Sequence, residues 1–250
     1  MTSSGKTSST ALVTGASRGF GRAIASALHA EGANVVALAR NAESLASLRH
    51  EFGGTLTTVS ADVADPVVAG TLIEQYQPDT LVLNAGAAPL MRPLQHHTWE
   101  SFSRNWEVDA RHAFHWIREA LLLPLRPGST VIAMSSGAAV AGSPLSGGYA
   151  GAKATIRFIT SYAADESARA GLGIRFISVL PRLTSATELG SMAVAAYARR
   201  EGIDVDQYLT QSGPGLTPED VGKATVDLVT SPEYAPGAYL LTTAGLTRAG

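Results

Sequence analysis

Short apolar runs alternate with segments of helical periodicity along the whole chain, and this alternation constrains the fold most. Runs at Ala11–Val13, Val35–Ala39 and Leu56–Val59 are each followed by a segment with the apolar spacing of a helix. The later runs are Thr80–Leu83, Val131–Met134, Ile174–Leu180 and Ala238–Leu241. Continuous apolar strands between helices indicate a parallel sheet that is covered on both faces. Because such crossovers are right-handed, the pattern predicts a doubly wound α/β fold of about seven strands.

The helical segments and the turns between them indicate one domain. A long helical stretch is expected from Trp99 to about Leu123, and a last helix at Pro218–Thr230 with Thr217 as its N-cap. The 250 residues contain no internal repeat and no linker rich in Pro, Gly and Ser. We therefore expect a flexible N-terminal tail at 1–9 and a single domain at 10–250.

Charge and composition exclude several classes of protein. The chain carries 19 basic and 21 acidic residues without a basic run, which argues against a nucleic-acid-binding or membrane-binding surface. No stretch approaches the roughly 18 apolar residues of a membrane span, and the polar start lacks the apolar core of a signal peptide. The absence of cysteine excludes disulfides and thiolate metal sites. These features predict a cytoplasmic protein with no nucleic-acid or membrane partner.

A glycine-rich turn lies where the first strand becomes the first helix, in the sequence TGASRGFG. Glycines at this place permit a tight turn and let backbone amides approach a pyrophosphate at the helix N-terminus. The turn predicts dinucleotide contacts from Gly15, Ser17, Arg18, Gly19, Phe20 and Gly21. The alternative is an ordinary strand-to-helix turn with no ligand.

Two arginines indicate which dinucleotide is bound. Arg40 ends the second apolar run, 19 residues after Gly21, where an acidic residue would accept hydrogen bonds from the ribose of NAD. A guanidinium cannot accept those bonds, but it suits a 2′-phosphate. Arg18, within the glycine turn, is placed to reach the same phosphate. The pair favours NADP(H) over NAD(H), unless both are ordinary surface charges.

A phenol and an ammonium fall one helical turn apart at Tyr149 and Lys153. Residues four apart share one face of a helix, so the two side chains are expected to meet. Ser136 stands thirteen residues before Tyr149, just past the Val131–Met134 strand. These three residues are the candidate catalytic group, and a solvent-exposed Tyr–Lys pair on a helix surface is the alternative.

Together the glycine turn, Ser136 and the Tyr-x-x-x-Lys pair resemble the classical short-chain dehydrogenase/reductase family, from Thr14 to about Leu241. The resemblance implies a single-domain Rossmann fold, with Ser136, Tyr149 and Lys153 as catalytic residues. It also implies that the chain forms a homo-oligomer, a dimer or tetramer, through its fourth and fifth helices. Further cofactor contacts are implied for Asp62, Val63, Asn84, Ala85, Gly86, Pro181 and Thr184. Thr187 is the alternative to Thr184 as the hydroxyl that contacts the nicotinamide amide.

The residue types suit the reduction of a carbonyl group and the reverse reaction. Reduction needs a hydride on carbon and a proton on the developing alkoxide. Tyr149 is the candidate proton donor; Lys153 favours its phenolate form and lowers the pKa of the phenol. The resemblance also assigns Lys153 hydrogen bonds to the nicotinamide ribose. Ser136 is expected to hold the substrate oxygen against Tyr149.

The sequence departs from the family at three places. Asp109 stands where the family usually has a fourth catalytic residue, an asparagine, and it is taken as catalytic in a modified proton relay. Arg182 follows Pro181 where a glycine is common, so this loop is expected to run differently. The usual Asp-Gly-Gly near the C-terminus is also missing.

The segment 183–216 is expected to form a substrate lid, with Gly213-Pro214-Gly215 as a possible hinge. Met192 in the lid and Leu145 before Tyr149 are expected to line the substrate pocket. Apolar lid residues favour an apolar or aromatic ketone, unless they only pack the lid down. The histidines near Asp109 are spread too widely around a helix for one ion, so no metal site is expected.

The leading interpretation is an NADP(H)-dependent oxidoreductase that acts on a carbonyl or secondary alcohol. The alternative is a catalytically weak or inactive dinucleotide-sensing or scaffold protein on the same fold, which the departures at Asp109, Arg182 and the C-terminus favour. A dehydratase or isomerase is a further option. The complete set of Ser136, Tyr149 and Lys153 favours the enzyme.

Overall fold

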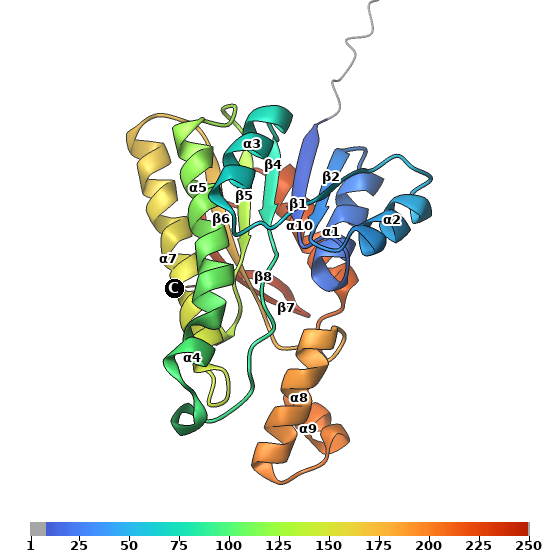
Figure 1. The fold of residues 1–250 in the computed structure, drawn as a ribbon, viewed down its shortest axis with the longest axis vertical. Helices are drawn as coiled ribbons and strands as arrows, with labels where there is room; N and C mark the ends of the chain where they lie inside the picture. Colours follow the sequence, from blue (N-terminus) through green and yellow to red (C-terminus); the bar gives the residue numbers. More distant parts are fainter. Residues whose placement is uncertain (1–8, 250) are drawn as a thin grey trace, which may run out of the picture.

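Eight strands form one sheet in the computed structural model, which describes residues 9–249 (Figure 1). They are β1 (Thr10–Thr14), β2 (Asn34–Ala39), β3 (Thr57–Ser60), β4 (Thr80–Leu83), β5 (Thr130–Met134), β6 (Arg175–Pro181), β7 (Gly237–Thr242) and β8 (Gly245–Arg248). Their order is β3-β2-β1-β4-β5-β6-β7-β8, and all neighbours are parallel except β7 and β8. The predicted single α/β domain is confirmed, with one antiparallel strand more than expected. Apart from Ser9, the expected N-terminal tail lies outside the described residues.

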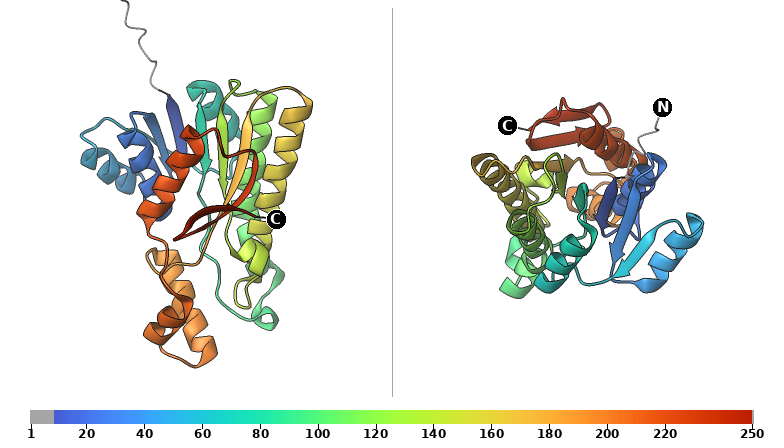
Figure 2. Two further views of the ribbon diagram at one scale, coloured as in Figure 1. Left: turned by 180° about the vertical axis from the view of Figure 1, so that it is seen from behind. Right: turned by 90° about the horizontal axis from the view of Figure 1, so that it is seen from above.

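Helices cover both faces of the sheet (Figures 1 and 2). They are α1 (Gly19–Ala30), α2 (Ala42–Glu51), α3 (Pro66–Tyr76), α4 (Trp99–Asn105), α5 (Arg111–Leu122), α6 (Ala138–Ala141), α7 (Gly147–Arg169), α8 (Glu188–Glu201), α9 (Val205–Ser212) and α10 (Pro218–Thr230). Side chains alternate across β1, because successive residues of a strand point to opposite faces. Ala11 and Val13 join the core beneath α1 and α10, whereas Leu12 joins the core that includes Trp116 of α5.

The long helix expected from Trp99 to Leu123 is divided into three parts. Helix α4 is followed by a π-helical segment, Trp106–Ala110, and then by α5. A π-helical turn holds one residue more than an α-helical turn, and such turns often occur at functional sites. Asp109 lies in this segment and is buried.

Helix α10 packs closely against α1. A Cβ at Gly222 would lie 2.8 Å from the carbonyl oxygen of Ala23, so the absence of a side chain at 222 permits the approach. The predicted N-cap is confirmed: Asp220 N donates to Thr217 Oγ1, and the Asp220 side chain accepts from Thr217 N. This capping box fixes the start of the helix.

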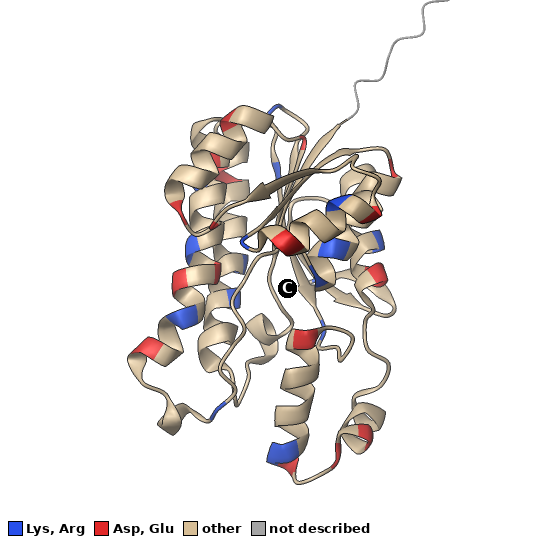
Figure 3. Cartoon of the chain, turned by 45° about the vertical axis from the view of Figure 1, so that its right-hand side comes forward, with Lys and Arg blue, Asp and Glu red and all other residues tan. Residues whose placement is uncertain are grey.

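Helices α8 and α9 project beyond the carboxyl ends of the strands and form the segment expected to be a lid (Figure 1). Arg182 Nη2 donates to the carbonyl oxygen of Ser212 at 3.0 Å, which ties the end of α9 to the loop after β6. Along the helices, basic segments are interspersed with acidic ones (Figure 3). Within residues 9–249, no helix is both long enough and apolar enough to cross a membrane.

Candidate active site

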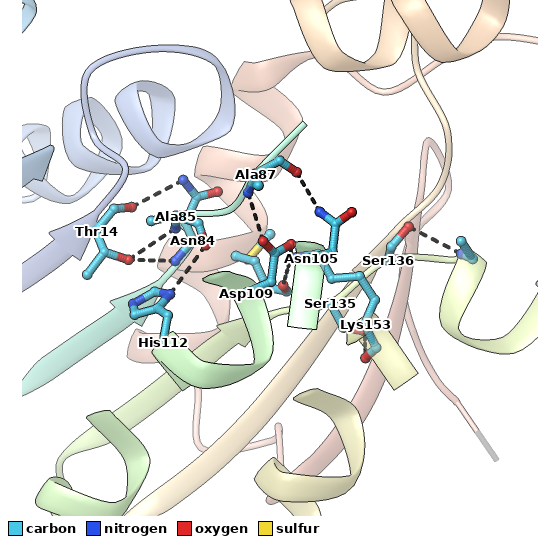
Figure 4. A network of polar contacts seen from close by, with 12 residues as sticks. Thr14, Asn84, Ala85, Ala87, Asn105, Asp109, His112, Ser135, Ser136 and Lys153 are labelled. Atoms are coloured by element: carbon cyan, nitrogen blue, oxygen red, sulfur yellow. Dashed lines mark hydrogen bonds and ion pairs between the residues drawn. The ribbon is translucent and has the colours of Figure 1, made fainter. Parts of the chain in front are cut away.

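The carboxyl ends of β1, β4 and β5 bring the candidate residues to one edge of the sheet. Thr14 ends β1, Asn84 follows β4, and Ser135 and Ser136 follow β5. Ligands of doubly wound folds bind at this edge, where the strand order reverses. Here the order reverses between β1 and β4. Figure 4 shows two sets of polar contacts at this edge, one around Thr14 and Asn84 and the other around Asp109 and Lys153.

The glycine turn is shaped by close backbone approaches that leave no room for side chains. Gly15 has φ of 66°, and a Cβ there would lie 2.8 Å from Ala85 Cα. A Cβ at Gly21 would lie 2.1 Å from the carbonyl oxygen of Gly15. Ser17 is half-buried, and Phe20 packs against the core beneath α1. The turn therefore has the tight path that dinucleotide binding requires at the start of a helix.

Thr14 and Asn84 hold the turn against the loop after β4. The Thr14 hydroxyl donates to Val82 O and accepts from Asn84 N and Ala85 N, at 3.2, 2.9 and 3.2 Å. Asn84 Nδ2 donates to the carbonyl oxygens of Thr14 and Gly15 at 3.2 and 3.3 Å. Sequence reasoning missed the supporting role of Thr14, although it is the first residue of the glycine motif.

The residues expected on the adenosine side lie around the ends of β2 and β3. Asp62 is exposed, and its Oδ1 accepts from Ala64 N at 3.0 Å. Val63 is buried, and its carbonyl oxygen accepts from Trp116 Nε1 at 2.9 Å, which anchors this loop to α5. Arg40 is exposed directly after β2.

Arg18 is also exposed, but it forms an ion pair with Glu188 in the first turn of α8. The pair joins the glycine turn to α8, in the segment expected to be a lid. Sequence reasoning missed this contact, because the two residues are 170 positions apart.

Lys153 and Tyr149 meet on the inner face of α7, as their spacing predicts. Lys153 Nζ lies 5.6 Å from the centre of the Tyr149 ring and donates to Met134 O at 3.1 Å. Ser135 Oγ donates to Lys153 O at 2.7 Å, which fixes α7 against the end of β5. Ser136 is half-buried, and its Oγ accepts from Ala138 N at 3.2 Å.

Asp109 lies beside Lys153, with Oδ2 at 3.3 Å from Nζ (Figure 4). Burial alone would lower the pKa of Lys153, but the charge of Asp109 and, less strongly, the nearby Tyr149 raise that pKa above its ordinary value. Lys153 is therefore a cation at neutral pH.

His112, one turn beyond Asp109, is buried and neutral. Burial and then the charge of Lys153 lower the pKa of His112 to about 3. Its Nδ1 donates to Ala85 O at 3.3 Å, so the imidazole supports the loop after β4. Among residues 9–249, no group of three or more His, Asp and Glu side chains could hold a metal ion.

Of the two expected substrate residues, one lies before α7 and the other on α8, in the segment expected to be a lid. Leu145 is buried before α7, whereas Met192 on α8 is 49% exposed. Ser143 and Tyr197 form a hydrogen bond that joins the segment before α7 to α8. Thr184 is buried, and its hydroxyl donates to Leu216 O. Pro181 O accepts from Gly137 N at 2.9 Å, which joins the loop after β6 to the loop after β5.

Comparisons with known proteins agree on the fold. The chain is 39% identical to human L-xylulose reductase over 100 residues, which is 40% of this chain and 41% of that protein. It is 30% identical to L-rhamnose 1-dehydrogenase (NAD(P)(+)) of Sphingomonas sp. (strain SKA58) over 249 residues, 95% of both chains. A solved NAD+-bound xylitol dehydrogenase superposes with a TM-score of 0.79 at 22% identity, over 92% of this chain and 95% of that one.

The family model for short chain dehydrogenase matches residues 9–197. That range contains the glycine turn, Ser136, Tyr149 and Lys153. By this match, and by the relative that aligns along almost its whole length, the chain belongs to the short chain dehydrogenase family.

Proposed function

We propose that the protein is an NADP(H)-dependent oxidoreductase that interconverts a carbonyl compound and the corresponding secondary alcohol. The observation that carries the proposal is the placement of Tyr149 and Lys153. The two residues meet on α7, and Lys153 donates to Met134 O at the carboxyl end of β5, the strand that Ser136 follows. The family match supports an oxidoreductase, and the names of its relatives are those of reductases and dehydrogenases.

The residues present fit a dinucleotide. Side chains at Gly15 and Gly21 would collide with the backbone, so only glycines permit this tight turn at the N-terminus of α1. We assign binding to the turn at 15–21, to Asp62 and Val63, to the loop 84–86, to Pro181 and to Thr184. The bound nicotinamide supplies the hydride for reduction or accepts it in oxidation.

The side chains of the site transfer the proton and orient the substrate oxygen. In reduction, the Tyr149 hydroxyl donates its proton to the carbonyl oxygen, while Ser136 donates a hydrogen bond that holds this oxygen in place. Lys153 is the adjacent cation that favours the phenolate left on Tyr149. In oxidation the phenolate accepts the proton of the alcohol.

NADP(H) is favoured over NAD(H) by the two arginines. Arg40 is exposed directly after β2, and Arg18 is exposed in the glycine turn, where it pairs with Glu188. R40D should weaken NADPH binding at least tenfold and leave NADH binding unchanged or tighter, because the acid repels a 2′-phosphate but accepts bonds from ribose hydroxyls. Fluorescence titration of both cofactors measures this; equal losses for the two would contradict the assignment.

The decisive experiment is NADPH oxidation across a panel of ketones, aldehydes and keto sugars, with NADH as the control cofactor. The panel includes sugars because similar proteins are named for L-xylulose and L-rhamnose. It includes apolar and aromatic ketones because Leu145 and Met192 are proposed to line the substrate pocket. Turnover with NADPH is expected. Tight NADPH binding without turnover of any compound would favour the dinucleotide-sensing protein instead.

Y149F tests the role of the phenol. It should abolish turnover while NADPH still binds, because phenylalanine has no proton to donate. Near-normal turnover would refute the assignment of Tyr149.

We also propose that the chain forms a dimer or tetramer. Large apolar side chains are exposed on α4, α5 and α7, with Trp99 at 78%, Phe114 at 49% and Phe158 at 68%. Exposed large apolar side chains on neighbouring helices are a feature of association surfaces. Light scattering coupled to size exclusion measures the mass; a monomer at micromolar concentration would exclude this assembly.

A further inference from the structure

The glycine turn and the start of α8 lie against each other. Arg18 forms an ion pair with Glu188, the first residue of α8, through Nη1 and Oε2. Thr187, the N-cap of α8, lies beside the same turn, since a Cβ built at Gly19 would lie 3.7 Å from Thr187 Cγ2. Two consecutive residues of the turn therefore meet two consecutive residues at the start of α8.

The local structure holds both charges in place. Arg18 is the N-cap residue of α1, with extended backbone and no hydrogen bond from its side chain to the helix, so its guanidinium is free to reach another element. Glu188 stands in the first turn of α8, where the helix dipole stabilises a negative charge. Thr187 Oγ1 accepts from Gly190 N at 3.1 Å, and this cap fixes the start of α8 beside the glycine turn.

The two arginines that are proposed to bind the 2′-phosphate differ in their partners. Within residues 9–249, Arg40 takes part in no ion pair, whereas Arg18 is paired with a carboxylate. The pair is open to water, because the side chains of Arg18 and Glu188 are 76% and 68% exposed. A phosphate can therefore reach Arg18 without any unfolding, but it meets a guanidinium that already holds an acid.

We infer that Glu188 is a specificity-determining residue that competes with the 2′-phosphate of NADP(H) for Arg18 and so reduces the preference for NADP(H) over NAD(H). The inference rests on the proposed function. A phosphate monoester carries nearly two negative charges at neutral pH and binds a guanidinium strongly. On Arg18 it would lie next to the Glu188 carboxylate, and the repulsion between them favours release of the carboxylate. NAD(H) brings no phosphate to this place, so the ion pair persists.

The exposure of the pair limits the size of the effect. Exposed ion pairs contribute a stabilisation that corresponds to about 1.4- to 5-fold in an equilibrium constant. Binding of the 2′-phosphate loses this stabilisation, whereas binding of a ribose with a free 2′-hydroxyl keeps it. Removing the carboxylate should therefore tighten NADPH binding by about 1.4- to 5-fold and leave NADH binding unchanged.

E188Q tests the inference, because glutamine removes the charge and keeps the size of the side chain. Fluorescence titration with NADPH and with NADH measures the two dissociation constants. A third probe, adenosine 2′,5′-bisphosphate measured by calorimetry, carries the 2′-phosphate without a nicotinamide and should gain the same factor as NADPH. E201Q, at the exposed last residue of α8, is the matched control and should change none of the three.

A double-mutant cycle shows whether Glu188 acts through Arg18. R18Q alone should weaken NADPH binding, because it removes a cation that binds the phosphate. Adding E188Q to R18Q should then change NADPH binding less than E188Q does alone. If R18Q leaves NADPH binding unchanged, or if E188Q has an equal effect in both backgrounds, Glu188 does not compete for Arg18 and the inference is wrong.

The outcomes separate this inference from the proposed function. Unchanged NADPH binding in E188Q would overturn the inference, and weaker binding would overturn it by showing that Glu188 holds Arg18 in position for the phosphate. Equal gains for NADPH and NADH would also contradict it, because the effect would not depend on the 2′-phosphate. If the wild type turns over no carbonyl compound, the proposed activity fails, and the three titrations still decide the role of Glu188.

Discussion

Replacing Thr14 with valine should destabilise the protein strongly, although the two side chains are nearly equal in size. Thr14 is fully buried, and its hydroxyl makes three hydrogen bonds, to Val82 O and from Asn84 N and Ala85 N. Valine has the same shape but no hydroxyl, so T14V leaves the two N–H groups without this acceptor. The loop after β4 then loses its attachment to the end of β1.

The magnitude follows from the three contacts. A hydrogen bond contributes about 1 kcal/mol net, and a buried donor left unsatisfied costs about 1–3 kcal/mol. T14V should therefore lower the free energy of unfolding by about 2–4 kcal/mol. T14S is the matched control, because it keeps the hydroxyl of Thr14 and loses only a methyl group, at a cost of about 1 kcal/mol.

Urea denaturation followed by circular dichroism measures the free energy of unfolding of both variants. Fluorescence titration with NADPH measures how each change affects cofactor binding at the glycine turn. We expect T14V to be the less stable variant and to bind NADPH more weakly than T14S. If T14S proved as destabilised as T14V, packing rather than hydrogen bonding would hold this junction, and the reasoning would be refuted.

Three further predictions concern stability. Burial lowers the pKa of His112 from 6.5 to about 3, so the unfolded chain binds a proton that the folded one lacks as pH falls through this window. The free energy of unfolding should therefore fall by up to about 1.4 kcal/mol per pH unit below pH 6.5. H112Q should reduce this dependence on pH, measured as urea midpoints from pH 7.5 to 5. The same dependence in H112Q and the wild type would contradict the prediction. T217A removes the capping box of α10 and should cost about 1 kcal/mol, measured by thermal melting. G222A drives a Cβ to 2.8 Å from Ala23 O and should cost about 1–3 kcal/mol. G70A, inside α3, meets only ordinary contacts and should leave stability unchanged or raise it by up to about 1 kcal/mol in the same assay.

The strands of the fold were largely predictable from the sequence because they are continuous apolar runs. The Val131–Met134 run became β5, Thr130–Met134, and Thr80–Leu83 is unchanged as β4. β8 could not be predicted, because Gly245–Arg248 contains one large apolar residue among polar and small ones. Its pairing with β7 depends on the turn between them rather than on a pattern of its own.

The π-helical segment could not be predicted from the sequence, for a different reason. One extra residue in a single turn barely changes the apolar spacing, so Trp106–Ala110 looks like part of one long helix. The extra residue matters only once Asp109 is seen beside Lys153.

Part of the candidate site could also be predicted from the sequence, and part could not. Residue types and spacing indicated Ser136, Tyr149 and Lys153, because Tyr149 and Lys153 interact within one helix and Ser136 follows a strand. The contacts between distant segments, such as Arg18 with Glu188 and Thr14 with Asn84, join residues 170 and 70 positions apart. No local pattern encodes those distances.

The packing of α10 on α1 has a consequence for folding of the chain during its synthesis. Helix α1 is synthesised early, yet Ile24 and Leu28 lie in a core that also needs Val221 and Leu228 of α10. A nascent chain that has not yet reached Pro218 leaves this apolar face open to water, and exposed surface of this kind is what chaperones and proteases recognise. Translation that stalls before α10 should therefore yield fragments that are cleared rather than half-active enzyme.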